Sequence, residues 1–127
     1  MNILVPISPG ELLDKITILE IKLARMADPA KLANVRRELE ALGAVEATLG
    51  PADSLPALRQ SLRAINETLW EIEDDIRDCE RAGDFGPRFV ELARAVYHTN
   101  DRRAAVKREV NLALGSRLIE EKSYAAY

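Results

Sequence analysis

Residues 55–79 read LPALRQSLRAINETLWEIEDDIRDC and contain the most regular pattern in this chain. Apolar side chains recur there at alternating spacings of three and four residues: Leu55, Leu58, Leu62, Ile65, Leu69, Ile72, Ile76 and Cys79. Side chains at this spacing share one side of an α-helix, because the helix turns once every 3.6 residues. The segment therefore predicts a long amphipathic helix, in which Cys79 is a small core residue rather than a nucleophile.

A second long helix is expected after this one. Residues 82–87, AGDFGP, break the apolar pattern, and the next helix is expected from about Pro87 to Leu114, where Gly115-Ser116 stops it. Each of the two helices would span about 27 residues, or roughly 40 Å at 1.5 Å per residue. Because only a short turn joins them, we expect one long antiparallel hairpin.

Two shorter helices are expected before the hairpin. Residues 8–11, SPGE, combine an N-cap serine, a proline at the first helical position and a glutamate three residues after the cap, so a helix should run from there to about Met26. Asp28-Pro29 repeats the cap and the proline, and the second helix should extend toward Gly50-Pro51. Residues 1–7, MNILVPI, are β-prone but find no second strand, so they predict a short extended arm.

Composition favours one ordinary globular unit. The chain has 127 residues, of which 47% are hydrophobic, so we expect a single all-α, four-helix domain over residues 1–127. The 18 Lys and Arg residues against 21 Asp and Glu residues give a net charge of −3, which disfavours binding to nucleic acid or anionic lipid. A single cysteine and no long apolar run predict a cytoplasmic protein without a membrane span.

Two charged residues interrupt apolar stripes and are the candidates for a site. Glu20 falls inside the apolar sector of the first helix when residues are placed about 100° apart. Arg103 falls near the centre of the stripe of the fourth helix, and three polar residues border it: Asn100, Lys107 and Asn111. A buried charge needs a partner, so we expect Glu20 and Arg103 to meet between the two helices.

This polar set has two interpretations. It could be a buried ion pair that only fixes the register of the helices. Alternatively, it could be an interhelical pocket in which Arg103 and Lys107 bind an anionic small molecule that Glu20 orients or acts on. The first interpretation requires that these polar groups pair only with one another.

An acidic row on the third helix could suggest a metal site. Glu67, Glu71, Asp74 and Asp78 share one helical face, and paired carboxylates can hold a divalent ion for nucleotide hydrolysis. This face lies opposite the apolar stripe, where a solvated surface is expected. The sequence therefore predicts a solvated acidic face with no metal and no cofactor. The alternative is that the same row binds a metal ion for hydrolysis.

Three stretches give the chain a family resemblance. They are SPGELLDKITILEIK at residues 8–22, DPAKLANVRREL at 28–39 and EEKSY at 120–124. With them the chain resembles a set of short bacterial helical proteins known as a domain of unknown function, and the likeness covers nearly the whole chain. The resemblance implies membership of a group without implying an activity.

The residues themselves favour a non-catalytic helical module that works through assembly or through a protein partner. Contiguous apolar surface is rarely left exposed on monomers, so the long hairpin and the N-terminal arm predict a homodimer. The alternative is a small enzyme or binder of an anionic small molecule, with Glu20, Arg103 and Lys107 in its pocket.

Overall fold

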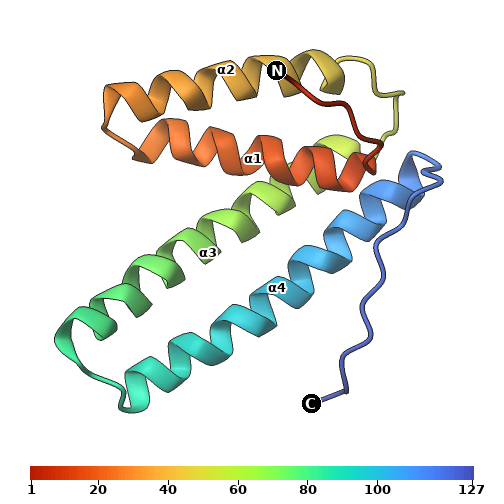
Figure 1. The fold of residues 1–127 in the computed structure, drawn as a ribbon. Helices are drawn as coiled ribbons and strands as arrows, with labels where there is room; N and C mark the ends of the chain where they lie inside the picture. The colour runs from red at the N-terminus through yellow and green to blue at the C-terminus, as the bar shows by residue number, and fades with distance from the viewer.

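The protein folds into four α-helices, as a computed structural model that describes all 127 residues shows (Figure 1). They are α1 (Pro9–Arg25), α2 (Pro29–Glu46), α3 (Leu55–Ala82) and α4 (Pro87–Ala113). No strand is present. The predicted all-α, four-helix arrangement is confirmed, and the main difference is that α2 ends four residues before Gly50.

The helix starts follow the capping signals of the sequence. The Ser8 hydroxyl oxygen accepts a hydrogen bond of 3.2 Å from the backbone N–H of Glu11, and Pro9 is the first residue of α1. The Asp28 carboxylate likewise accepts from the backbone N–H of Ala30 at 2.9 Å. Each cap satisfies a backbone donor that the first turn of a helix leaves without an intrahelical acceptor.

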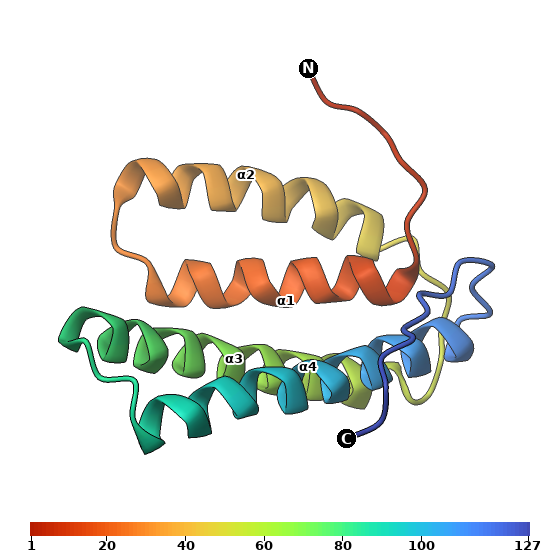
Figure 2. The ribbon, with the colours of Figure 1, turned by 60° about the horizontal axis from the view of Figure 1, so that its bottom comes forward.

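The two long helices form the predicted antiparallel hairpin. They have 28 and 27 residues and lie side by side along their length in both ribbon views (Figures 1 and 2). Gly83 ends α3 with a φ of +66°, a left-handed conformation that glycine adopts at low cost. The backbone N–H of Asp84 then donates to the Cys79 carbonyl at 2.9 Å, which closes the last turn of α3.

Helix α1 is the middle layer of the fold, because it contacts α2 on one side and both hairpin helices on the other (Figure 2). Its buried residues therefore lie around most of its circumference: Gly10, Leu12, Leu13, Asp14, Ile16, Thr17, Leu19 and Ile21. Helix α2 packs along α1, meets α3 through the ion pair of Glu46 with Arg59, and has Val35 as its one buried residue. None of the four helices is both long enough and apolar enough to cross a membrane.

The core of the hairpin is divided into two apolar clusters with a polar layer between them. One cluster, near the open end of the hairpin, contains Leu13, Leu62 and Val110, and the other, near the turn, contains Ile72, Cys79 and Leu92. Asn66 and Thr99 lie between the clusters along α3 and α4 and are buried. Asn66 of this polar layer donates hydrogen bonds to Asp14 and Thr17 of α1.

Both ends of the chain lie outside the helices. Residues 1–7 form an extended arm that leads away from the bundle, as predicted (Figure 2). The C-terminal tail, residues 115–127, runs back along α4 without regular secondary structure (Figure 1). Three polar side-chain contacts attach it there: Lys107 to Glu120 at 2.9 Å, Arg108 to Glu121 at 3.0 Å, and the Tyr127 hydroxyl to the Asp101 carboxylate.

Candidate functional site

The predicted contact between Glu20 and Arg103 is wrong. The Glu20 carboxylate instead accepts hydrogen bonds of 3.1 and 3.2 Å from the guanidinium of Arg59 on α3, and Arg63 lies 3.7 Å away. Arg59 also donates to Glu46 of α2 at 2.8 Å. Hydrogen bonds to Glu46 and Glu20 raise the pKa of Arg59 despite its partial burial. Glu20 therefore belongs to an ion network that joins α1, α2 and α3, away from α4.

The error has a geometric cause. The sequence prediction placed Glu20 in the apolar sector of α1 and paired it with the one charge on the stripe of α4, but α1 is covered on two sides and Glu20 lies on the other one. Glu20 faces the side where α2 meets α3, whereas a second buried face, which includes Asp14 and Thr17, contacts the hairpin. Each of the two interfaces of α1 therefore has its own ion pair: Glu20 pairs with Arg59 in one, and Asp14 pairs with Arg103 in the other.

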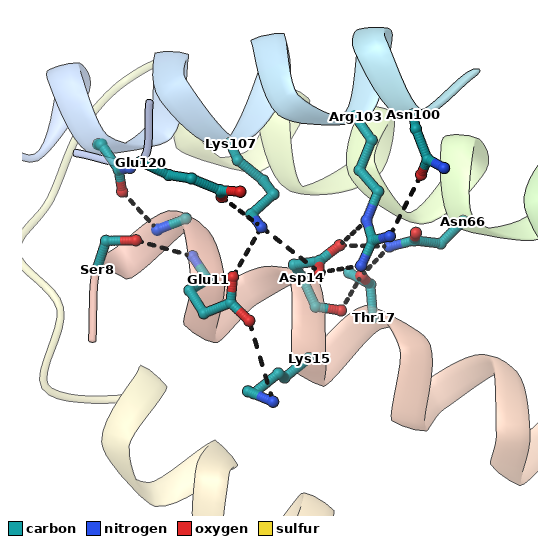
Figure 3. Close-up of polar contacts among 12 residues, drawn as sticks. Ser8, Glu11, Asp14, Lys15, Thr17, Asn66, Asn100, Arg103, Lys107 and Glu120 are labelled. Atoms are coloured by element: carbon teal, nitrogen blue, oxygen red, sulfur yellow. Dashed lines mark hydrogen bonds and ion pairs between the residues drawn. The ribbon is translucent and has the colours of Figure 1, made fainter. Parts of the chain in front are cut away.

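The partner of Arg103 is Asp14, and the two side chains form a bidentate pair (Figure 3). Arg103 Nε donates to Asp14 Oδ1 at 2.8 Å and Nη2 donates to Oδ2 at 2.5 Å. Asn66 Nδ2 adds a hydrogen bond of 3.0 Å to Asp14 Oδ1 and one of 3.1 Å to Thr17 Oγ1. The Asp14 residue is only 1% exposed, so these contacts replace all of its hydration.

This pairing keeps Asp14 ionised. Burial raises the pKa of Asp14, but hydrogen bonds from Arg103 and Asn66 and the charges of Arg103 and Lys107 outweigh that effect and lower it. The hydrogen bond to Asp14 raises the pKa of Arg103 in turn. Both groups are therefore charged at neutral pH, and neither is poised to exchange a proton.

Lys107 is a buried cation surrounded by carboxylates (Figure 3). Its Nζ lies 2.7 Å from Glu11, 2.9 Å from Glu120 and 3.9 Å from Asp14. Burial lowers the pKa of Lys107, but hydrogen bonds to Glu11 and Glu120 and the charge of Asp14 outweigh burial and raise it. Because Glu11 bonds to Lys107, its side chain does not complete the capping box at Ser8 that the sequence predicted.

The start of α1 lies unusually close to α4. The backbone N–H of Gly10 donates to Asn111 Oδ1 at 2.7 Å. A Cβ atom at Gly10 would lie 2.4 Å from the Lys107 carbonyl oxygen and 2.9 Å from Asn111 Oδ1, so only glycine fits there. Asn111, one of the predicted site residues, thus holds the helices together and does not line a pocket with the others.

A small hollow lies where these residues meet the C-terminal tail. It has a volume of 230 Å³, and we call it the cationic hollow; it is lined by Asn100, Arg103, Ala104, Lys107, Glu120 and Lys122. Three of the predicted site residues, Asn100, Arg103 and Lys107, therefore share one cavity, while Glu20 and Asn111 lie elsewhere. The side chain of Arg103 is 29% exposed here, and that of Lys107 is 11% exposed.

The charged side chains that line this hollow are three cations and one carboxylate: Arg103, Lys107, Lys122 and Glu120. Every buried side-chain nitrogen and oxygen in the protein has a hydrogen-bond partner.

No three His, Cys, Asp or Glu side chains are grouped so that they could hold a metal ion. In the acidic row of α3, Glu71 pairs with Arg25 at 2.5 Å and Glu67 pairs with Arg63 at 3.6 Å.

Sequence reasoning missed Asp14, Asn66 and Glu120. Asn66 lies four residues after Leu62 and three before Leu69, so helical spacing alone could have placed it against the apolar stripe. Gly10, Asp14 and Thr17 are spaced by four and three residues, so they share a second face of the first helix. Nothing in the sequence brings Glu120 to Lys107, because the tail has no periodicity.

The comparisons with known proteins give a family without an activity. A family described as a family of unknown function (DUF6165) matches residues 3–127. No curated protein and no solved structure matches the chain. The match covers α1 to α4 and the C-terminal tail, and with them every residue of the cationic hollow. The chain therefore belongs to the DUF6165 family of unknown function.

Proposed function

We propose that the protein is a non-catalytic binding module that holds an anionic group of a ligand or protein partner in the cationic hollow. One observation carries this proposal: the hollow already holds a carboxylate, supplied by the chain itself. Glu120 of the C-terminal tail lies 2.9 Å from Lys107 Nζ and lines the hollow together with Arg103 and Lys122. An external carboxylate or phosphate offers the same oxygen atoms to the same cations.

Of the three carboxylates around Lys107, Glu120 is the one that a ligand can replace. Glu11 and Asp14 are part of α1 and bond to α4 inside the bundle, so displacing them would separate the two helices. Glu120 comes from a segment without secondary structure, and its side chain is 49% exposed. Because water screens the half-exposed Glu120 carboxylate, we expect the pair to contribute only about 1 kcal/mol, which a ligand can offset.

Charge states favour binding over acid–base catalysis. A general acid or base works best when its pKa lies near the working pH. Here the pKa of Asp14 is lowered and the pKa of Lys107 is raised, so both shifts point away from neutrality. The alternative of a small enzyme would need a reactive group that these residues do not supply.

The test compares two neighbouring carboxylates of the tail. Glu120→Gln removes the internal carboxylate from the hollow, whereas Glu121→Gln removes the same charge from a contact with Arg108 on the surface. Affinities for acetate and for inorganic phosphate are obtained from the rise in melting temperature with ligand concentration, with chloride holding ionic strength constant.

We expect Glu120→Gln to bind both anions about fivefold more tightly than the wild type, because about 1 kcal/mol of internal competition is removed. Glu121→Gln should bind them as the wild type does. Equal gains in the two variants would show a general charge effect, and no binding by any of the three proteins would end the proposal.

A second candidate function, self-association, is supported by apolar surface that the fold leaves uncovered. In the N-terminal arm Met1, Ile3, Leu4 and Val5 are between 64% and 114% exposed, and on the hairpin Phe85 and Val90 are more than half exposed. We propose that these surfaces join two copies in a symmetric homodimer.

Light scattering tests the dimer. The full chain should have about twice the mass of 14.1 kDa, and deletion of residues 2–7 should shift the equilibrium toward the monomer. A full-length particle of 14.1 kDa that persists as concentration rises would rule the dimer out.

A further inference from the structure

All three tyrosines of the chain line a single hollow, which we call the tyrosine hollow. Tyr97 belongs to α4, and Tyr124 and Tyr127 belong to the C-terminal tail. The hollow has a volume of 370 Å³, within the range of about 300–1,000 Å³ that is typical of small-molecule pockets. Its remaining lining residues are Val96, Asn100, Asp101 and Lys122.

The far end of the tyrosine hollow is held in place by the last residue of the tail. The Tyr127 hydroxyl donates a hydrogen bond to Asp101, which raises the pKa of Tyr127 and keeps it neutral. The Tyr127 ring lies 5.3 Å from the Tyr97 ring and 4.8 Å from the His98 ring, centroid to centroid. These contacts fix the distance between the tail and α4 on this side of the hollow.

The tyrosine rings remain largely uncovered in spite of these contacts. Tyr124 is 81% exposed, Tyr127 is 75% exposed and Tyr97 is 43% exposed. Covering exposed aromatic surface with a flat apolar group lowers the free energy, because apolar surface is removed from water. Pairs of aromatic rings are stabilised further when they are stacked or packed edge to face. A ring placed between α4 and the tail would contact several of these side chains at once.

The tyrosine hollow adjoins the cationic hollow. Asn100 and Lys122 line both of them, so one molecule can extend from one into the other. A third hollow, of 480 Å³, shares Asn100 and Arg103 with the cationic hollow and is lined by Trp70. Aromatic walls and anion-binding side chains are thus combined around Asn100.

We infer that the ligand of this site is a small aromatic anion. Its carboxylate or phosphate replaces the Glu120 carboxylate beside Lys107 and Arg103, and its ring lies against Tyr97, Tyr124 and Tyr127. Lys122, whose Nζ is 5.8 Å from the centre of the Tyr124 ring, contributes a positive charge where the two hollows meet. This inference rests on the proposed function, because it assigns a chemical class to the ligand of the same hollow.

The experiment uses pairs of anions with the same charged group, of which one member carries a benzene ring and the other does not. The full-length Glu120→Gln protein, in which the internal carboxylate is gone, is titrated with acetate and benzoate, and with inorganic phosphate and phenyl phosphate. Isothermal titration calorimetry gives each affinity. We expect the ring to improve affinity about tenfold within each pair, and the better pair shows whether the anionic group is a carboxylate or a phosphate.

A substitution locates the ring. Tyr124→Ala should reduce the gain in affinity from the ring, because it removes one of the three aromatic walls, and should leave the affinity for acetate unchanged. The matched control is Leu112→Ala, which removes an exposed apolar side chain of α4 that lines neither hollow and should leave the gain from the ring intact.

The outcomes separate the two proposals. Acetate and phosphate that bind without any gain from the ring would overturn the aromatic ligand and leave the proposed function standing. A gain from the ring that is as large in Tyr124→Ala as without this substitution would place the ring elsewhere and also overturn the inference. If none of the four anions binds, both proposals fail.

Discussion

Replacing Asp14 by Asn tests the polar layer at its most buried charge. The substitution keeps the shape of the side chain but removes the negative charge that faces Arg103 at 2.5 and 2.8 Å. A hydrogen bond to a charged group contributes about 1.5–3 kcal/mol, and removing one partner of a buried pair costs about 3–5 kcal/mol. Because the Arg103 side chain is 29% exposed, water recovers part of this loss. We therefore expect unfolding free energy to fall by about 3 kcal/mol.

Urea denaturation followed by far-UV circular dichroism measures this change. The matched control is Glu20→Gln, which also removes one carboxylate of α1 from a guanidinium, but where the side chains of Glu20 and Arg59 are 25% and 31% exposed. That variant should lose only about 1 kcal/mol. If Asp14→Asn does not fold, Arg103→Lys, which keeps the charge but loses the bidentate geometry, gives a milder measurement. A loss for Asp14→Asn no greater than that for Glu20→Gln would refute the assignment of Asp14 and Arg103 as the central pair.

Two further predictions follow from the same contacts. In the same urea titrations, Gly10→Ala should destabilise the fold by about 1–3 kcal/mol, because the new Cβ would clash with the Lys107 carbonyl. Gly43→Ala, which has open space around it, should be neutral or stabilising by up to about 1 kcal/mol. Because the pKa of Asp14 is lowered in the folded state, its contribution to stability is present above its ordinary pKa of 3.8 and is lost as the pH falls through the lower folded value. Unfolding free energy measured against pH should therefore drop more steeply below that point in the wild type than in Asp14→Asn, and parallel curves would contradict this.

The helices were predictable because their signals are local. The apolar spacing of residues 55–79, the Ser8 and Asp28 caps and the glycine at position 83 each act within a few residues of where they stand. These features determine where a helix begins, ends and turns without reference to the rest of the fold. The hairpin followed as well, since two helices of matched length joined by a short turn pack side by side.

The site was only partly predictable because its contacts are not local. The interrupted stripe of α4 pointed to Arg103, and the structure places Arg103, Asn100 and Lys107 in one cavity. The partner of Arg103 could not be chosen between Glu20 and Asp14, because both are carboxylates of the first helix and their spacing alone does not show which of them faces α4. That choice depends on which face of α1 meets α4, and the crossing of α1 over the hairpin decides it.

The contacts of the C-terminal tail could not be predicted from the spacing of apolar residues. Residues 120–127 have no repeating apolar pattern, yet they bring Glu120 to Lys107 and two tyrosines to Tyr97. The attachments are ion pairs, a hydrogen bond and ring contacts, each of which depends on distances that exist only after α4 has formed.

The most direct test of the proposed anion site is a ¹⁵N NMR titration of the wild-type protein with phenyl phosphate, recording the Nε–H signals of Arg103 and Arg59. Both guanidinium groups donate through Nε to a carboxylate, but only Arg103 lines the cationic hollow. The account predicts that the Arg103 signal and the backbone amide of Glu120 shift together with one dissociation constant, as the ligand replaces the Glu120 carboxylate, while the Arg59 signal stays in place. Equal shifts at the two arginines, or none at Arg103, would contradict it.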